Sequence, residues 1–131
     1  MKKLLYLVLA VCVVTVCFSS NGWTQRKTTI KVGINAPMTG DIPKVGEGTK
    51  YAAEMWLEDV NKAGGIEVGG KKYPVEVVLE DNESKAESAV KANTKMITQD
   101  DVMIIIGPQS SKQAVPAGDV ANNYETPMIS P

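Results

Sequence analysis

The sequence predicts an α/β protein built on a doubly wound parallel sheet, and two observations support this fold class. Short apolar segments of the strand type, at residues 30–36, 75–80 and 102–106, alternate with longer segments whose apolar residues recur every three or four positions. Clusters of Gly, Pro, Asn and Asp separate these segments. This alternation is typical of βαβ units, in which right-handed crossovers place helices on both faces of the sheet.

The first strand, loop and helix follow from the spacing of apolar residues. Residues 30–36 alternate apolar and polar side chains, whereas residues 37–43 contain two prolines, a glycine and an aspartate, which indicates a loop. Residues 47–63 have the periodicity of an amphipathic helix, which Gly64 and Gly65 terminate. The apolar face expected to pack on the sheet consists of Ala52, Met55, Trp56, Val60 and Ala63. Trp56 is expected to pack there rather than to contact a ligand.

A hairpin, a second strand and a second helix are expected next. The Gly69–Gly70 pair before the strand at 75–80 matches a two-residue hairpin turn. Ser84 followed by Glu87 matches a capping box, which predicts a helix from there to about Gln99. Its expected buried residues are Ala86, Ala89, Val90, Met96 and Ile97.

The third strand is expected at the centre of the sheet, because residues 102–106 form a continuous apolar run. A third helix is predicted from Ser110 or Ser111. This helix contains Pro116, which leaves two possible arrangements. Either the proline lies in the first turn, where a missing N–H is tolerated, or the helix starts one or two residues later. The expected buried residues of this helix are Ala114, Val115, Ala117, Val120, Ala121 and Tyr124. Residues 128–131 resemble the opening of a fourth strand, so we expect the 131 residues to form an incomplete lobe.

The amino terminus has the layout of a secretory signal peptide, residues 1–22. Two lysines precede an apolar run at residues 4–18, which is shorter than the roughly 20 residues that a membrane-spanning helix needs. Cleavage after Gly22 or after Ser19 fits the small-residue rule. A lipobox-like sequence ending at Cys17 offers the alternative of a lipid-anchored protein.

The composition of the mature domain, residues 23–131, restricts its function. Both cysteines, Cys12 and Cys17, lie in the leader and histidine is absent, so the usual ligands of zinc, iron and copper are missing and no cofactor is expected. The leader holds two of the 14 Lys and Arg, which leaves 12 against 15 Asp and Glu. This balance argues against nucleic acid as a partner. We expect a binding protein rather than an enzyme.

The ligand site is expected where the strand order reverses. With the order 2-1-3-4, a ligand binds beyond the carboxyl ends of strands one and three, which are followed by loops 37–46 and 107–111. The second loop, Gly-Pro-Gln-Ser-Ser, offers backbone N–H groups and two hydroxyls at a helix N-terminus, which suits a carboxylate or a phosphate. Alternatively the serines cap the helix, and both roles are compatible.

Several sequence blocks together resemble one protein family. In chain order they are Ile30–Gly33, Met38–Gly40, Asn61–Ile66, Glu80–Asn82, Ile106–Ser111 and Pro127–Pro131. They resemble the N-terminal lobe of the leucine/isoleucine/valine-binding proteins, the type I periplasmic binding proteins of branched-chain amino-acid ABC transporters. The resemblance implies a periplasmic or other extracytoplasmic protein that captures an amino acid, branched-chain or similar, for a membrane permease. A sensor domain with the same fold is the alternative.

The resemblance also implies site residues. Ser111 would hold the α-carboxylate of the ligand, with Ser110 beside it and Gln109 in the same loop. Val45 stands where some relatives have an aromatic residue next to the ligand, which leaves the preferred ligand side chain open. The resemblance places the contacts to the ligand ammonium group beyond Pro131.

Other motif-like patterns have simpler structural explanations. Residues 65–71 match the spacing of a phosphate-binding P-loop, but Lys72 replaces the required Ser or Thr and the context favours a hairpin. A Gly-Glu-Gly sequence at 46–48 begins a dinucleotide fingerprint but lacks its third glycine. The acidic clusters at 80–83 and 100–101 are expected in solvated turns rather than at a calcium or catalytic site.

Overall fold

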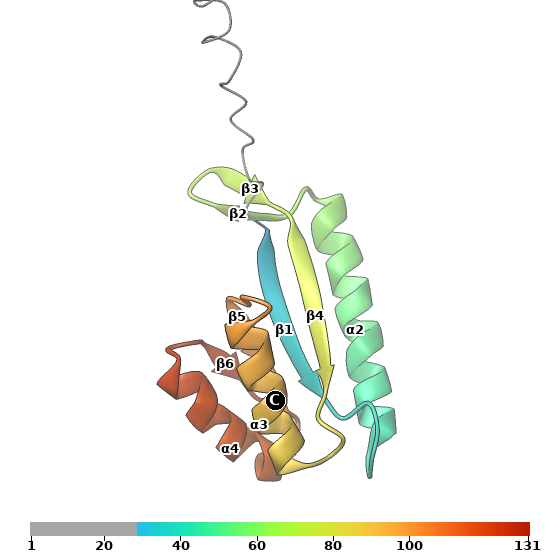
Figure 1. The fold of residues 1–131 in the computed structure, drawn as a ribbon. Coiled ribbons are helices and arrows are strands. Elements are labelled where there is room, and N and C mark those ends of the chain that lie inside the picture. The colour runs from blue at the N-terminus through green and yellow to red at the C-terminus, as the bar shows by residue number, and fades with distance from the viewer. Residues whose placement is uncertain (1–28) are drawn as a thin grey trace, which may run out of the picture.

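The computed structural model describes residues 29–131. The predicted leader, with its two cleavage sites and Cys17, lies outside the described residues. The elements in chain order (Figure 1) are β1 (Ile30–Ala36), α2 (Pro43–Lys62), β2 (Ile66–Val68), β3 (Lys71–Tyr73), β4 (Val75–Asp81), α3 (Ala86–Thr98), β5 (Ile104–Ile106), α4 (Ser111–Asn123) and β6 (Met128–Ile129).

The main sheet has four parallel strands in the order β4-β1-β5-β6. β1 pairs with β4 along its whole length, with Ile34 opposite Leu79. On its other side β1 pairs with β5, with Ile34 opposite Ile106. This is the predicted order 2-1-3-4 of the main strands, so the doubly wound α/β fold, its inner third strand and the fourth strand at β6 are confirmed.

Helices pack on both faces of this sheet. On one face, Val32 and Ile34 of β1 share an apolar cluster with Ala53, Leu57 and Val60 of α2. The opposite face is covered by α3, and α4 packs beside α3 (Figure 1).

Close packing of α3 on the sheet depends on a glycine in β1. A Cβ atom at Gly33 would lie 2.8 Å from the sulfur of Met96, a residue of α3 that is fully buried. Ile105 of β5 is also fully buried in this second cluster. The alternation of β1 therefore sends Val32 and Ile34 to one layer and the Gly33 position to the other.

Three fully buried asparagines connect the sheet to α3 and α4. The Asn35 amide donates to Ala89 O at 3.0 Å and to Asn93 Oδ1 at 2.8 Å. Asn82 Nδ2 donates to Asn35 Oδ1 at 2.8 Å, and Asn93 Nδ2 donates to Ala117 O at 2.9 Å. Because unpaired polar groups are costly in the interior, this hydrogen-bonded network fixes the position of α4 relative to the end of β1.

The predicted hairpin is confirmed as the antiparallel pair β2 and β3. Its turn residues, Gly69 and Gly70, have φ angles of 58° and 77°. Positive φ at both central residues is the requirement of a type I′ turn, which glycine meets without strain. The segment that imitates a P-loop is therefore a hairpin, as its context indicated.

The helix α2 begins at Pro43, four residues before its predicted start at residue 47. Proline suits the first helical position because its φ is preset and its missing N–H has no helical partner there. The second half of the predicted site loop 37–46 is therefore helical.

The predicted buried face of α2 is also wrong, apart from Val60. Ala53 and Leu57 pack toward the sheet with Val60, whereas Met55 is 68% exposed and Trp56 is 38% exposed. Apolar residues occupy two neighbouring faces of this helix, and both faces have helical periodicity. The prediction from periodicity chose the face that is exposed in the structure. Tertiary packing chose the inner one.

The predicted capping box at Ser84 is not formed. Lys85 is the N-cap residue of α3, and no side chain caps this helix. The Ser84 hydroxyl instead donates to Thr39 O at 2.9 Å and accepts from the N–H of Asp41 at 3.0 Å. The hydroxyl is used between two loops, which leaves none for the helix.

The packing of α3 follows the predicted pattern in part. Its buried residues are Ala89, Ala92, Asn93 and Met96. Ala86, Val90 and Ile97, which were predicted to be buried, are half-buried. The interior position of Asn93 was missed because an asparagine interrupts an apolar stripe.

Two further boundaries differ from the predictions. β5 spans three residues rather than 102–106, and Met103 is 58% exposed. α4 starts at Ser111 as predicted, but Pro116 is its sixth residue, so neither expected arrangement of this proline is correct. The missing N–H removes the helical hydrogen bond that residue 116 would otherwise donate to the carbonyl of Lys112.

The buried face of α4 is made of small residues. Ala114, Ala117 and Ala121 are buried with Gln113, as predicted for the three alanines, and Val120 is half-buried. Val115 and Tyr124 are exposed, contrary to the prediction.

Candidate ligand-binding site

The carboxyl ends of β1 and β5 lie side by side at one edge of the sheet. From β1 the chain crosses through α2 to β4, and from β5 it crosses through α4 to β6 on the opposite side. Two crossovers that leave neighbouring strands in opposite directions form a crevice in which α/β proteins bind ligands. The predicted site loops therefore lie at the switch point of the sheet.

The loop after β1 is held by the carboxylate of Asp81 at the end of β4. Asp81 Oδ1 accepts from the backbone N–H groups of Met38 (2.9 Å), Thr39 (3.1 Å) and Glu83 (2.8 Å). Asp81 Oδ2 accepts from the Thr39 hydroxyl at 2.6 Å. Burial raises the pKa of Asp81, but these hydrogen bonds, first the one from the Thr39 side chain, outweigh burial and lower the pKa below its usual value.

The same loop packs tightly against the segment after β4. Gly40 has a φ of 89°, and a Cβ atom there would lie 2.2 Å from Glu83 O. With the Ser84 hydroxyl on Thr39 O, this contact closes the loop onto β4. The loop after β1 is thus a fixed support for the first turn of α2.

The loop after β5 is anchored on both sides. The Gly107 N–H donates to Ile129 O at 2.8 Å, and Ser130 Oγ donates to Pro108 O at 2.6 Å. Gly107 has a φ of 92°, and a Cβ atom there would lie 2.3 Å from Asn35 O. Only glycine fits between this loop and the end of β1.

The serines at the start of α4 are not used as caps. Ser110 is the N-cap residue, and its carbonyl accepts from the N–H groups of Gln113 (2.9 Å) and Ala114 (2.8 Å), but its hydroxyl makes no cap hydrogen bond. Within residues 29–131, neither the Ser110 nor the Ser111 hydroxyl has a hydrogen-bond partner. Ser110 is half-buried and Ser111 is exposed. This turn presents free hydroxyls and first-turn N–H groups at the positive end of the helix dipole.

Gln109 lies between the serines and α2, and it faces α2. Its Nε2 donates to Thr49 Oγ1 at 2.8 Å. Val45, on the preceding turn of α2, is 42% exposed. The structure therefore places Gln109, Ser110 and Ser111 in one turn and connects that turn to the helix that carries Val45.

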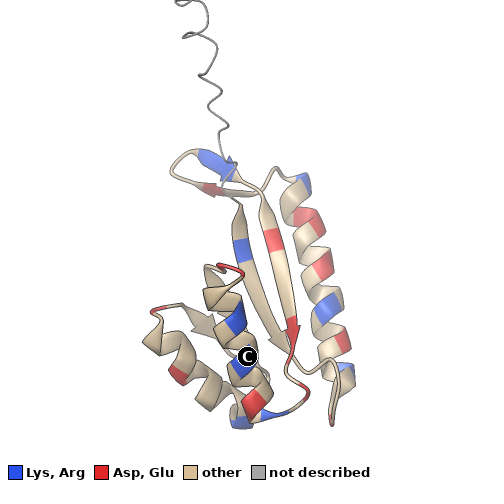
Figure 2. Ribbon diagram, viewed as in Figure 1, with Lys and Arg blue, Asp and Glu red and all other residues tan. Residues whose placement is uncertain are grey.

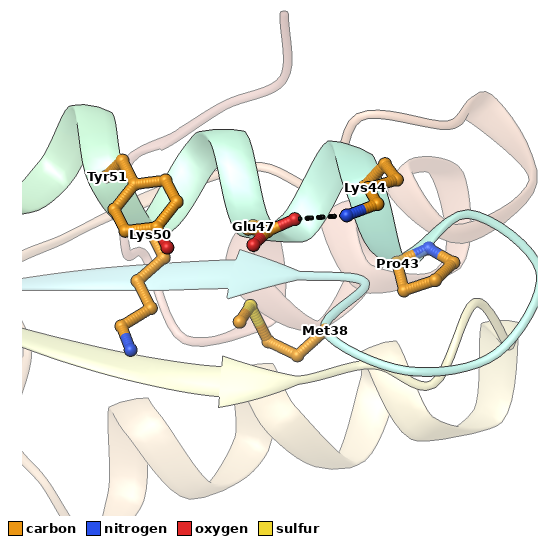
Figure 3. Close-up of a pocket in the computed structure, with 6 residues that line it drawn as sticks. All are labelled: Met38, Pro43, Lys44, Glu47, Lys50 and Tyr51. Carbon is orange, nitrogen blue, oxygen red and sulfur yellow. Dashed lines mark hydrogen bonds and ion pairs between the residues drawn. The ribbon is translucent and has the colours of Figure 1, made fainter.

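Two hollows lie on the other flank of α2. The first, about 370 Å³, is lined by Met38, Pro43, Lys44, Glu47, Lys50 and Tyr51, with an ion pair of 2.9 Å between Lys44 and Glu47 (Figure 3). The second, about 320 Å³, lies between α2 and Val77 and Leu79 of β4. Neither is lined by a residue of the loop after β5. The switch point is the candidate site, because a helix N-terminus lies there with serine hydroxyls that have no partner within residues 29–131.

The acidic clusters have structural roles. Glu80 pairs with Lys95, and Asp100 Oδ2 lies 3.6 Å from the same ammonium group. The hydrogen bond with Glu80 is the largest cause of a raised pKa of Lys95. No group of three or more metal-ligating side chains occurs within residues 29–131. Figure 2 shows that charges of both signs are interspersed, with acidic and basic residues mixed along α2.

Sequence reasoning missed the residues that support the site. Asp81 was predicted as part of a solvated turn, yet it holds the loop after β1, and Asn35 and Asn82 were not singled out. A polar residue at an inward position next to a strand end is the signal that could have found them.

In the part of the chain that the structure describes, no helix has the length and apolar character needed to cross a membrane.

Comparisons with known proteins agree with this fold. The profile of a family described as periplasmic binding protein matches residues 29–131. The leucine-, isoleucine-, valine-, threonine-, and alanine-binding protein of Pseudomonas aeruginosa is 32% identical over 109 residues, which are 83% of this chain and 28% of that protein.

Solved structures of substrate-binding proteins also align with this chain. The isoleucine complex of a branched-chain amino acid transporter substrate binding protein from Streptococcus pneumoniae aligns with a TM-score of 0.71 and 33% identity, over 79% of this chain and 28% of that one. A solute binding protein of an ABC transporter from Rhodopseudomonas palustris, in complex with 3,4-dihydroxybenzoic acid, aligns with a TM-score of 0.66 and 29% identity, over 78% and 26%.

The chain spans about a quarter of the length of the proteins it matches, between 26% and 29% of the first three curated relatives. The family profile nevertheless covers every described residue. The chain therefore belongs to the periplasmic binding protein family, of the type I group that includes the leucine/isoleucine/valine-binding proteins.

Proposed function

We propose that the whole protein is an extracytoplasmic solute-binding protein that captures an amino acid, first of all a branched-chain one, for an ABC transporter. One observation carries the proposal. The turn at the start of α4 offers two serine hydroxyls without partners in residues 29–131, at the switch point of the sheet. Such a turn suits the carboxylate that every amino acid has.

Each residue of the turn has a stated role in this proposal. Ser111 Oγ and the Ser111 N–H donate to one carboxylate oxygen, and the half-buried Ser110 hydroxyl donates to the other. Hydrogen bonds to a charged acceptor are stronger than neutral ones, typically contributing about 1.5–3 kcal/mol. Val45 flanks the ligand side chain from α2, and its modest size leaves room beside the carboxylate site.

The ligand class rests on what related proteins bind. One similar structure contains isoleucine and another contains 3,4-dihydroxybenzoic acid. Both ligands combine a carboxylate with an apolar or aromatic body, which matches an anion-binding turn next to an apolar side chain. Isoleucine is the first candidate because the sequence identity to its binding protein is higher, 33% against 29%.

The transport role and its partner are supported in the same way. The solved relatives are named as transporter components, which supports delivery to a membrane permease over the alternative of a sensor. The leader at residues 1–22 fits export. Capture then involves closure of this lobe on a second one, as in other hinged binding proteins.

Calorimetric titration of the natural full-length protein tests the proposal. L-leucine, L-isoleucine, L-valine and 3,4-dihydroxybenzoate are titrated separately, with L-lysine as a control for charge. We expect saturable binding of at least one branched-chain amino acid and none of lysine. Binding of dihydroxybenzoate alone would redirect the proposal to aromatic acids, and binding of none would contradict it.

A further inference from the structure

Gln109 forms a hydrogen-bonded connection across the switch point. Its Nε2 donates to Thr49 Oγ1 at 2.8 Å, and the Thr49 hydroxyl donates its own proton to Val45 O at 2.9 Å. The two bonds run in one direction, from the loop after β5 to the first turns of α2. They join segments that are 60 residues apart in the sequence.

The first turns of α2 are supported by both site loops. At Gly46 a Cβ atom would lie 2.3 Å from Pro37 O, so the helix packs directly on the loop after β1. Three residues later, Thr49 receives the hydrogen bond from Gln109. The Gly46 contact fixes how close α2 lies to the loop after β1, and the hydrogen bond sets its position relative to the loop after β5.

The oxygen of the Gln109 side-chain amide has no partner among the described residues. Oε1 is fully buried and accepts no hydrogen bond within residues 29–131. A buried acceptor without a partner lowers stability, and an apolar side chain of similar length would avoid that cost. The bond of Nε2 to Thr49 is therefore the contact through which this amide acts on α2.

We propose that Gln109 and Thr49 are positioning residues for the ligand. Their hydrogen bond holds Val45 on α2 and the turn of Ser110 and Ser111 at a fixed separation, so that one small ligand contacts both. This replaces the expected direct contact of Gln109 with the ligand. The inference rests on the proposed function and adds how the two halves of the site are kept in register.

Substitutions that remove the hydrogen bond but keep side-chain volume test this role. Gln109→Met and Thr49→Val are made in the natural full-length protein, with Thr49→Ser as the variant that keeps the hydroxyl. Thr98→Val is the matched threonine control, because within residues 29–131 the Thr98 hydroxyl bonds only to Thr94 O, one turn earlier in α3. Gln99→Met is the glutamine control, at the exposed C-cap position of α3.

Affinity for L-isoleucine and the thermal midpoint are then measured for each variant. Gln109→Met and Thr49→Val each weaken binding by about three- to tenfold, the range expected for one lost neutral hydrogen bond. The double variant is no weaker than the weaker single, because both changes break one contact. Thr49→Ser and both controls keep wild-type affinity, and Gln109→Met keeps or raises the midpoint.

Three results would overturn the inference. The first is unchanged affinity in Gln109→Met or Thr49→Val, and the second is additive losses in the double variant. The third is a Gln109→Met protein whose midpoint falls together with its affinity. If the wild type binds no isoleucine, the proposed function fails, and hydrogen–deuterium exchange decides the positioning role separately. Gln109→Met then speeds exchange of the amides in both 44–50 and 108–114, and unchanged exchange there would disprove the connection.

Discussion

The side-chain amide of Asn93 in α3 donates to the carbonyl oxygen of Ala117 in α4 at 2.9 Å, and both residues are fully buried. Asn93 also accepts from Asn35 at the end of β1. A single side chain thus joins the sheet, α3 and the helix whose first turn carries the candidate site. The position of that turn depends on a polar contact in the core.

The first prediction concerns this contact. Replacement of Asn93 by Ala leaves Ala117 O and one proton of the Asn35 amide with fewer partners, so the free energy of unfolding should fall by about 2–4 kcal/mol. Urea denaturation measures the change. Asn122→Ala, at an exposed position of α4, is the control and should change stability by less than about 0.5 kcal/mol. Equal effects of the two substitutions would contradict the role of the network.

The second prediction separates ligand binding from capping at Ser111. Ser111→Ala should weaken binding of the preferred amino acid by about ten- to a hundredfold, because one charge-assisted hydrogen bond is lost. The stability of the ligand-free protein should change little, since the serine makes no cap bond. Titration calorimetry and denaturant melts measure both quantities. Unchanged affinity beside a loss of about 1 kcal/mol in stability would instead identify a helix cap.

A third prediction follows from the pKa of Asp81, which is lower in the folded protein than the usual 3.8. A depressed pKa means that the carboxylate stabilises the fold above its unfolded-state pKa and that this contribution is lost as pH falls through the folded-state pKa. Asp81→Asn should lower stability by about 1–2 kcal/mol at pH 7. The difference from wild type should shrink below about pH 4.

Chemical denaturation at several pH values checks this dependence. Asp119→Asn is the control, because Asp119 is an exposed residue of α4. At every pH, its free energy of unfolding should stay close to the wild-type value. A stability difference for Asp81→Asn that stays the same from pH 7 to pH 3 would show that the loop is not held by the ionised carboxylate.

The fourth prediction compares two glycines. Gly107→Ala should destabilise the protein by about 2–5 kcal/mol, because φ is positive and the new Cβ would overlap Asn35 O. Gly48→Ala meets no atom within 4 Å and lies inside α2, so it should stabilise the protein by about 0.5–1 kcal/mol. Thermal melts of both variants test the pair. A tolerated alanine at 107 would contradict the close contact between the loop and β1.

The fifth prediction concerns the apolar surface of the described chain. Met55, Trp56 and Ile129 are exposed by 68%, 38% and 59%, and exposed apolar side chains favour contacts between copies of the chain. A polypeptide of residues 23–131 alone should therefore self-associate and unfold without a sharp transition. Sedimentation velocity and circular dichroism measure this, and Met55→Lys should reduce the association. A monomer with a steep cooperative melt would refute the prediction.

The agreement between sequence and structure is greatest where a pattern is local. The alternation in residues 30–36 and the Gly69–Gly70 turn both gave the observed element, because strand pleat and turn conformation depend on nearest neighbours. The Gly-Pro-Gln-Ser-Ser turn at the switch point was also found, since right-handed crossovers restrict where such a loop can lie.

The sequence by itself determined the order of strands and helices and the place of the serine turn. Only the tertiary structure decided which face of α2 is buried, that Ser84 binds the loop after β1 instead of capping α3, and that Gln109 bonds to Thr49. The last two outcomes depend on partners that are 45 and 60 residues away in the chain. A hydroxyl or amide has several possible partners of similar strength, and only the packing of distant segments determines which of them is within reach.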